Sequence, residues 1–377
     1  MPDKKLFIII NEDRFFLSHR KDIGMSARQK GWDVTIVAKD TGVAGDIRKL
    51  GLKFLELPIN PTGKNIFQEL GVLKFLSRLY RKNPDAIFHH VGFKILLWGG
   101  LAARLHKVRG VVNAISGMGT LFTGDKPSPL TKFIFPILKF NNSHSNQIFY
   151  IFQNLDDERI FKEKKLLNRD NYCLIKGSGV NLEEFDFTEI PEGEPLHVVY
   201  TGRMLREKGV VDMVKAAEIL RPKYEGKVSF ILCGGLSSNP SALSEEELQG
   251  LVDGTYIVWM HHQKNVKKVL QECVLFCFPS YREGFPKSVI EASAVGRPIV
   301  TYDSIGCRDT VEDGVNGYKV PLKDYKSLAR KIDVILSNQE LARDMGAESR
   351  KIAERDYNIN DVVSKHLDIY QSLYNGH

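Results

Sequence analysis

Two carboxylates eight residues apart enclose the most distinctive turn of the sequence. Glu283 is followed by Gly284-Phe285-Pro286, and Glu291 falls about a turn and a half into the helix expected after the proline. Gly284 lets a ligand approach the backbone closely, and Pro286 suits the first position of a helix. The turn therefore offers free amides and a positive helix end to an anion, and the carboxylates can accept hydrogen bonds from hydroxyls. Together these groups suggest binding of a nucleotide sugar.

A second charged segment follows an earlier expected strand. Arg203 and Lys208 lie within residues 201–209, between a strand at 197–200 and a helix at 210–220. Open α/β sheets bind ligands at the carboxyl ends of their parallel strands, which is where this loop falls. Arg203 can bind two phosphate oxygens at once, and Lys208 adds a compact positive charge. The residues alone fit diphosphate binding and, as the alternative, a basic loop in solvent.

These two segments resemble the retaining glycosyltransferases of family 4. The signature of that family is Glu, seven residues, Glu with a Gly-Phe-Pro turn of this kind, and a Gly-Arg, then Lys-Gly pattern corresponds to Gly202-Arg203 and Lys208-Gly209. The resemblance implies that Arg203 and Lys208 stabilise charge on the departing nucleoside diphosphate. It also implies that Glu291 binds ribose hydroxyls, and that Glu283 binds the sugar together with backbone groups of residues 284–286.

Two further positions match the nucleotide end of the family's site. Gly234, in Cys233-Gly234-Gly235, corresponds to a small-residue turn near the nucleotide, and His261 lies in a loop that touches the base through backbone groups. Adjacent histidines such as His261 and His262 rarely bind one ion, so we expect a surface loop there and assign no metal.

The segment after the first strand departs from the family pattern. Many members carry a pair of glycines here to admit the donor phosphate, and residues 11–20 contain none. Ser18, His19 and Arg20 could instead reach the expected cleft. The alternative, an acidic and then aromatic helix start, fits the residues equally well.

Two strand ends of the first half supply candidates on the acceptor side. Several family members place a histidine after the strand at 111–115, where this chain has Ser116-Gly117, a variant similar to that of a subset acting on lipid-linked sugars. His90, at the end of the strand at 86–90, could supply the missing contact to the transferred sugar. The alternative is a strand-end histidine whose hydrogen bonds are satisfied within the protein.

Strands that alternate with helices along the whole chain predict the α/β class with parallel, doubly wound sheets. The resemblance implies the GT-B fold, in which two Rossmann-like domains face a cleft. We expect an acceptor-binding domain at 1–182, a linker at 183–195, a nucleotide-sugar-binding domain at 196–358, and a helix at 359–377 that crosses back to the first domain. Twelve strands are expected, at 6–10, 33–38, 54–57, 86–90, 111–115, 147–152, 197–200, 227–233, 255–260, 274–278, 299–302 and 318–320.

The charge is unevenly distributed and bears on the partner. Residues 1–150 hold 23 Lys and Arg against 11 Asp and Glu, a balance of +12, whereas the whole chain of 377 residues carries +7. The basic residues are dispersed, without zinc spacing or an aromatic RNA-binding consensus, so we exclude nucleic acid. An anionic membrane surface or a lipid-diphosphate acceptor fits better, with solubility as the plain alternative. Residues 126–146 mix phenylalanines with lysines, which suits a membrane interface as well as an ordinary packing helix interrupted by Pro136.

The five cysteines and the lack of long apolar runs bear on location. An odd number of cysteines, mostly in apolar runs, indicates free thiols in a reducing compartment. Cys273 and Cys277 flank the middle of an expected strand, so core packing is favoured over a metal site. We expect no leader at the start of the chain. No apolar run of the sequence approaches the ~20 residues of a membrane-spanning helix. We expect a cytoplasmic protein, either free or peripheral on the inner face of the cell membrane.

The sequence thus predicts a retaining glycosyltransferase that needs no cofactor or metal. It would move a hexose or N-acetylhexosamine from a nucleoside-diphosphate sugar, with UDP favoured, to a polyprenyl-diphosphate-linked glycan or another growing polysaccharide. A GT-B-fold epimerase and a non-catalytic nucleotide-binding module remain alternatives. A dinucleotide-dependent oxidoreductase is disfavoured, because the first strand ends without a Gly-x-Gly-x-x-Gly.

Overall fold

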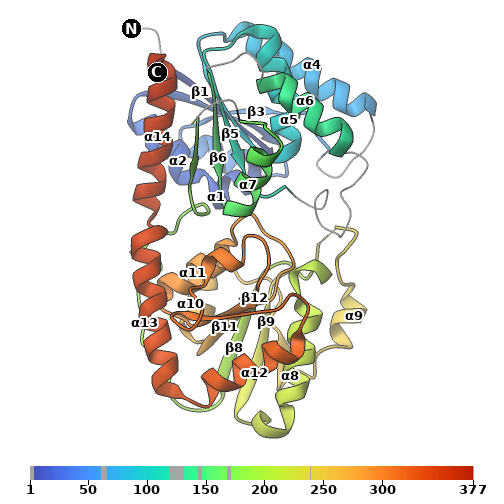
Figure 1. The fold of residues 1–377 in the computed structure, drawn as a ribbon, viewed down its shortest axis with the longest axis vertical. Coiled ribbons are helices and arrows are strands. Elements are labelled where there is room, and N and C mark those ends of the chain that lie inside the picture. The colour runs from blue at the N-terminus through green and yellow to red at the C-terminus, as the bar shows by residue number, and fades with distance from the viewer. Residues whose placement is uncertain are drawn as a thin grey trace. The chain divides into compact units, whose positions relative to one another are not determined.

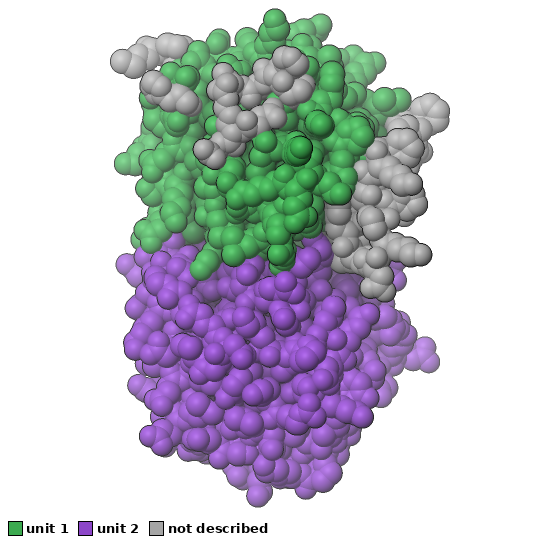
Figure 2. Space-filling model, in the orientation of Figure 1, with its two compact units in different colours: residues 1–178, 359–377 green, residues 179–358 purple. Residues whose placement is uncertain are grey.

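The chain forms two compact units (Figure 2). Each unit is built around one parallel sheet. The computed structural model describes residues 4–60, 66–118, 131–142, 147–167, 171–237 and 239–376. The first unit comprises Met1–Ser178 with Ile359–His377, and the second comprises Gly179–Asn358. Among the described helices, none is both long enough and apolar enough to cross a bilayer.

The sheet of the first unit has the strand order β3-β2-β1-β4-β5-β6-β7. The order reverses between β1 and β4, and loops at the carboxyl ends of strands on either side of such a reversal form the usual ligand site of open α/β sheets. The seventh strand was not predicted from the sequence, because it has three residues and none of them is fully buried. The strands are β1 (Lys4–Glu12), β2 (Trp32–Lys39), β3 (Lys53–Glu56), β4 (Ile87–Val91), β5 (Gly110–Ile115), β6 (Ile148–Phe152) and β7 (Tyr172–Leu174).

Helices cover both faces of this sheet (Figure 1). Alternate residues of β1 point to opposite faces, so that Phe7 and Ile9 join one hydrophobic cluster and Leu6, Ile8 and Ile10 join the other. The last helix of the chain, α14 (Ile359–Asn375), packs on the same face as Leu6, Ile8 and Ile10 and belongs to the first unit. One face carries α1 (Asp13–His19), α2 (Lys21–Gln29), α3 (Ala44–Lys49) and α14 (Ile359–Asn375), and the other carries α4 (Ile66–Lys82), α5 (Phe93–His106), α6 (Thr131–Asn142) and α7 (Leu155–Glu163).

The sheet of the second unit has the order β10-β9-β8-β11-β12-β13 and reverses between β8 and β11. Its strands are β8 (Leu196–Thr201), β9 (Val228–Cys233), β10 (Ile257–Trp259), β11 (Leu275–Phe278), β12 (Ile299–Tyr302) and β13 (Gly317–Val320). Helix α8 (Val210–Tyr224) packs against α12 (Tyr325–Leu336), and α11 (Lys287–Val295) packs against α10 (Val266–Gln271) and α13 (Gln339–Asp356). A short helix, α9 (Glu245–Gln249), precedes β10.

Residues 183–195, which we predicted to be a linker, are a packed part of the second unit. Ile190 is only 7% exposed and belongs to the core of this unit. The fully buried Arg297 donates to the carbonyl oxygens of Thr188 at 3.0 Å and Glu189 at 3.1 Å. The acids and prolines of this segment predicted a linker, but the buried Arg297 needs hydrogen-bond acceptors and finds them in the backbone of the segment.

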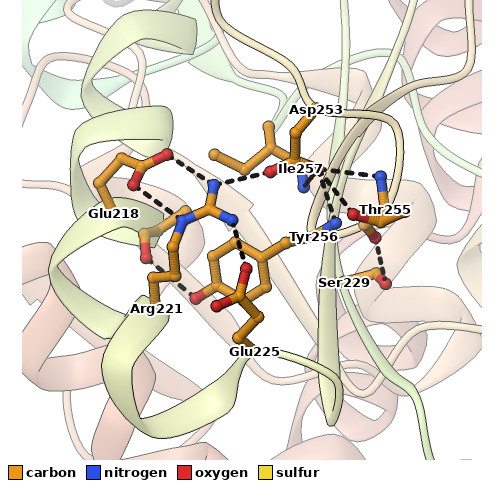
Figure 3. Close-up of polar contacts among 9 residues, drawn as sticks. Glu218, Arg221, Glu225, Ser229, Asp253, Thr255, Tyr256 and Ile257 are labelled. Atoms are coloured by element: carbon orange, nitrogen blue, oxygen red, sulfur yellow. Dashed lines mark hydrogen bonds and ion pairs between the residues drawn. The ribbon is translucent and has the colours of Figure 1, made fainter.

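A cluster of charged residues fixes the end of α8 to the turn before β10 (Figure 3). Arg221 lies 2.7 Å from Asp253, 2.8 Å from Glu218 and 3.0 Å from Glu225, and its guanidinium lies 4.4 Å from the ring centre of Tyr256. Burial would raise the pKa of Asp253, but hydrogen bonds from three backbone amides and from Arg221 hold it below its ordinary value. The ion pairs of this cluster therefore hold the end of α8 against the turn before β10.

Candidate functional site

The loops that follow β8 and β11 are in direct contact, because these strands are neighbours at the reversal of strand order. The backbone N–H of Tyr281 donates to the carbonyl oxygen of Glu207 at 2.9 Å. Gly209 has φ +73°, and a Cβ there would lie 2.0 Å from the carbonyl oxygen of Pro279. Only glycine fits at this position, so the sequence Lys208-Gly209 is a requirement of the contact.

Lys208 and Glu283, predicted separately from the two loops, form an ion pair through Oε1 of the glutamate. Their side chains are 15% and 14% exposed. The hydroxyl of Ser280 donates to the same carboxylate oxygen at 2.7 Å. The backbone of Glu283 is also fixed, since its N–H donates to the carbonyl oxygen of Ile305 at 2.9 Å. A cation and a carboxylate are thus held together with restricted access to solvent.

Arg203 supplies an exposed cation in the loop after β8. Its carbonyl oxygen accepts a hydrogen bond from the hydroxyl of Tyr200 at 3.0 Å, which fixes the backbone. In the part of the chain that the structure describes, the guanidinium makes no hydrogen bond or ion pair. Such a group is available to an anionic ligand, and its planar fork suits phosphate oxygens.

Helix α11 begins at the signature turn and carries the second glutamate. Pro286 is its N-cap and makes no side-chain capping hydrogen bond. Phe285, which we predicted to be a donor-binding residue, is 7% exposed and packs on Tyr357 with ring centres 5.5 Å apart, so its side chain belongs to the core. Glu291 is 14% exposed and lies 3.3 Å from Lys287. Burial raises the pKa of Glu291, and the nearby ammonium of Lys287 opposes that rise.

The predicted nucleotide end of the site is assembled through the backbone. The N–H of Gly234 donates to the carbonyl oxygen of His261 at 2.8 Å, and the Trp259 ring N–H donates to the Gly234 carbonyl at 2.8 Å. A Cβ on Gly234 would lie 1.7 Å from the carbonyl oxygen of Gly202. The loops after β8, β9 and β10 therefore meet, and the imidazole of His261 lies 3.8 Å from the Trp259 ring. The structure brings these three predicted residues together with Arg203 and Lys208 on consecutive strand ends of one sheet.

The structure contradicts the predicted catalytic role of His90. The side chain is 0% exposed. One ring nitrogen lies 2.6 Å from the hydroxyl of Tyr80, and the other lies 2.8 Å from the side-chain oxygen of Asn113. Burial lowers the pKa of His90 to about 4, although the hydrogen bond with Asn113 opposes this. With both nitrogens occupied inside the core, His90 has none to offer a substrate, and the alternative of a satisfied strand-end histidine holds.

Arg20 is also misplaced by the sequence-based prediction. It is 3% exposed, and its guanidinium donates to the carbonyl oxygen of His19 at 3.0 Å instead of reaching solvent. Burial lowers its pKa to about 10, while the Tyr370 side chain on α14 favours the charged form. Arg20 therefore belongs to the interior of the first unit.

The other first-unit candidates are accessible. Ser18 and His19 are exposed, and the Ser18 hydroxyl lies 2.6 Å from Nδ1 of His19. Ser116 is exposed at the end of β5, and Gly117 has φ +102°. Residues 119–130 lie outside the described ranges, so the rest of this loop has no structural account.

The predicted membrane stretch at 126–146 is only partly described. Residues 126–130 and 143–146 and the side chains of residues 131–133 lie outside the description. Helix α6 continues through Pro136, which we had expected to interrupt it. Leu138 is buried at 0% exposure, whereas Phe140 is 51% exposed with Arg104 lying 4.2 Å from its ring centre. One side of the helix therefore packs as an ordinary core helix does.

Sequence reasoning missed the residues that support the site from behind. Asp212 is 5% exposed and accepts hydrogen bonds from the hydroxyls of Tyr281 and Tyr302, each at 2.9 Å. Gly306 lies so close that its Cβ would be 2.4 Å from the carbonyl oxygen of Glu283. The position of Asp212 in the first turn of a helix rich in buried residues was the sequence feature that could have indicated its role. Gly306 gave no signal, because its contact partner lies in another loop.

No group of three side chains that could hold a metal ion occurs among the described residues. The five cysteines are free, four of them buried and Cys173 half-buried.

Comparison with known proteins places this geometry in context. A family model described as glycosyl transferase 4-like matches residues 5–154, and one described as glycosyl transferases group 1 matches residues 181–352. A Campylobacter jejuni protein, N,N'-diacetylbacillosaminyl-diphospho-undecaprenol alpha-1,3-N-acetylgalactosaminyltransferase, is 26% identical over 95% of this chain and 98% of its own length. The Staphylococcus aureus capsular polysaccharide biosynthesis glycosyltransferase CapM is 23% identical over 100% of this chain and 98% of its own.

Solved structures share the fold across the whole chain. A glycosyltransferase from Rickettsia africae has a TM-score of 0.77 at 16% identity and covers 99% of both chains. Anabaena HepE in complex with UDP has a TM-score of 0.76 at 14% identity, covering 98% of this chain and 100% of its own. These likenesses and the two doubly wound sheets confirm the predicted α/β, GT-B class.

Proposed function

Since the chain belongs to the glycosyltransferases, through the group 1 and the 4-like families, we propose that it is a retaining enzyme acting on lipid-linked or polysaccharide acceptors. It takes a hexose or N-acetylhexosamine from a UDP-sugar donor. The observation that carries the proposal is the Lys208–Glu283 ion pair at the reversal of strand order, beside the exposed guanidinium of Arg203. This combination offers cations for a diphosphate and a carboxylate for sugar hydroxyls at one place.

Each charged residue then has a separate role. Arg203 and Lys208 bind the diphosphate and stabilise the negative charge that develops on it as the glycosidic bond breaks. The carboxylate of Glu283 accepts hydrogen bonds from the sugar, and the amides of Gly284 and Phe285 lie in the same turn. Glu291, one and a half turns into α11, accepts hydrogen bonds from the ribose. The backbone of residues 202, 234 and 261 forms the nucleotide end.

Retention follows from attack on the same face that the diphosphate leaves. The acceptor hydroxyl forms a bond to the anomeric carbon while the bond to the diphosphate oxygen breaks, and the departing phosphate takes the hydroxyl proton. The residues of the site supply charge stabilisation and orientation for this step.

The relatives support the choice of donor and acceptor. The Campylobacter relative is named for a diphospho-undecaprenol acceptor, and HepE has been solved with UDP. The epimerase alternative is not favoured, because both matched family models describe transferases.

Donor binding and turnover test the proposal directly. A thermal-shift panel of UDP, GDP, ADP and their sugar conjugates should give a rise in melting temperature with the uridine compounds. Lys208→Ala and Glu283→Ala should each remove most turnover of the sugar donor. Lys223→Ala is the matched control, because it breaks a 2.6 Å ion pair with Asp333 at the far end of α8. Wild-type turnover in both site variants, or no shift with any nucleotide, would reject the proposal.

We further propose that the reaction needs no metal ion. The cations of Arg203 and Lys208 then supply all the charge that a divalent ion would bring to a diphosphate. Turnover should be unchanged in excess EDTA. A loss of turnover in EDTA that added Mg²⁺ or Mn²⁺ reverses would contradict this.

Peripheral attachment to an anionic membrane is the final part of the proposal. It rests on the +12 balance of residues 1–150 and on the exposure of Leu105 at 61% and Phe140 at 51% near Arg104. Binding to anionic liposomes should weaken with moderate salt, since surface charge is screened within about 10 Å at 0.1 M. The variant with Leu105→Ser and Phe140→Ser should bind less, and absence of binding at low salt would reject attachment.

A further inference from the structure

Ser280 holds the carboxylate of Glu283 through a buried hydroxyl. The side chain is 0% exposed, and its oxygen lies 2.7 Å from Oε1 of Glu283. The carbonyl oxygens of Glu207 and Arg282 lie farther away, at 3.4 and 3.5 Å. A hydroxyl has one hydrogen to donate, and O–H···O bonds are normally about 2.7–2.8 Å long. The hydrogen therefore goes to the carboxylate.

Ser280 is itself fixed by the strand that follows. The hydroxyl of Ser304, a residue that is 3% exposed, donates to the carbonyl oxygen of Ser280 at 2.7 Å. The N–H of Ser280 donates to the carbonyl oxygen of Phe278 at 2.9 Å, and the hydroxyl of Thr301 donates to that same oxygen at 2.6 Å. A continuous set of hydrogen bonds thus runs from the end of β12 through Ser280 to Glu283.

The two oxygens of the carboxylate have different surroundings. Oε1 receives both the Ser280 hydroxyl and the ammonium of Lys208. Among the described residues, none donates a hydrogen bond to Oε2. With one oxygen held by two donors, the rotation of the carboxylate is restricted and Oε2 is left to accept from a ligand.

We propose that Ser280 is a positioning residue, which together with Lys208 holds Oε1 of Glu283 so that Oε2 faces a hydroxyl of the transferred sugar. This inference rests on the proposed function. Loss of one hydrogen bond to a charged group corresponds to roughly a 10- to 100-fold change in an equilibrium or rate. Ser280 acts on the sugar through Glu283, so its effect should appear with the sugar donor and not with UDP alone.

Three variants test this step. Ser280→Ala removes the hydroxyl, and Ser280→Cys fills the same space with a weak donor. Both should lower kcat/KM for the UDP-sugar donor about 10- to 100-fold, while the dissociation constant of UDP stays within about twofold. Ser293→Ala is the matched control, because Ser293 is also 0% exposed but its hydroxyl has no partner in the described structure. Full activity in Ser280→Cys would mean that Ser280 only fills space and would overturn the proposal.

A measurement without substrate separates this inference from the proposed function. Urea unfolding of the ligand-free protein is compared for Ser280→Cys, Glu283→Gln and the double variant. A double variant that is more stable than additivity predicts shows that the two side chains interact in the folded state. Additive effects would overturn the positioning role, whatever the activity. If the protein binds no nucleotide but the two variants are coupled, the proposed function is rejected, whereas the interaction between Ser280 and Glu283 is still supported.

Discussion

The two units have the same kind of sheet, but they place different polar groups beside its reversal of strand order. In the first unit, β4 carries His89 on the face covered by α14 and His90 on the face covered by α4, and both side chains are 0% exposed. In the second unit, the loops of β8 and β11 place Lys208 and Glu283 there, at 15% and 14% exposure. Burial favours the neutral form of a histidine, whereas the ion pair of the second unit is partly exposed and therefore accessible to a ligand. We therefore expect acid to destabilise the first unit and an anionic ligand to bind to the second.

The largest expected effect is acid destabilisation of the first unit. Burial holds the pKa of His90 at about 4, that of His366 at about 3, and that of His89 well below its ordinary value of 6.5. Below pH 6.5 the unfolded chain binds protons that the folded chain does not, so stability present above pH 6.5 is lost as the pH falls. Three such histidines should lower the free energy of unfolding of the first unit by about 4 kcal/mol between pH 7.5 and 5.5. Hydrogen exchange resolved to peptides of each unit measures this.

The second unit is the internal control for that measurement. No histidine among its described residues is buried, so its protection factors, corrected for the intrinsic pH dependence of amide exchange, should change less than those of the first unit over the same range. The groups that face His366 in the first unit are Arg20, His89 and Tyr370, and Arg20 disfavours protonation of both histidines. His366→Phe should remove about one-third of the pH dependence. Equal acid sensitivity in the two units would break the comparison.

The next effect compares one cation from each unit. Lys208→Met should lower kcat/KM by about 100- to 1000-fold, as loss of one group that stabilises developing charge does. Arg20→Met should leave kcat/KM within severalfold and change the free energy of unfolding by about 1 kcal/mol, because a buried charge replaced by an apolar side chain of similar size is often neutral. Donor kinetics and urea unfolding of the two variants measure both quantities. A large loss of turnover in Arg20→Met would place Arg20 in the site after all.

A smaller effect is expected behind the site of the second unit. Tyr302→Phe leaves the buried carboxylate of Asp212 with one hydroxyl donor fewer, which should cost about 1.5–3 kcal/mol of unfolding free energy. Tyr281→Phe removes the other donor from the half-buried turn next to Glu283 and should cost less in stability. Urea unfolding and donor KM distinguish the two. Tyr302→Phe with full stability would show that Asp212 is satisfied without it.

The sequence predicted the second site better than the first for a physical reason. Glu283, Glu291 and the turn between them are contiguous, and a parallel sheet brings the loop of Lys208 to the same edge. The errors concern burial, which depends on residues far along the chain. His90 is satisfied by Asn113, 23 residues away, and the hydroxyl of Tyr370 lies 2.6 Å from His89, 281 residues away. Local pattern cannot show such partners, and Ser280 escaped notice because its importance lies in one contact.

The smallest effect concerns a charge cluster of the second unit that lies apart from the strand-end loops. Arg221→Ala removes the ion pairs with Glu218, Glu225 and Asp253, all partly exposed, and the contact with Tyr256 (Figure 3). Exposed pairs are worth about 0–1 kcal/mol each and are screened by salt, so we expect a loss near 1 kcal/mol that shrinks in 0.5 M NaCl.

The pH dependence of the stability lost in Arg221→Ala provides a second test of that prediction. The pKa of Asp253 is held below its ordinary value of 3.8, so its contribution is present above pH 3.8 and is lost as the pH falls below it. The cost of Arg221→Ala should therefore be constant from pH 7.5 to 5.5, the range over which the buried histidines make the first unit less stable. Donor kinetics should not change. A loss of turnover as large as that of Lys208→Met would mean that charge anywhere in the second unit serves the ligand, and the distinction between its site and its structural ion pairs would fail.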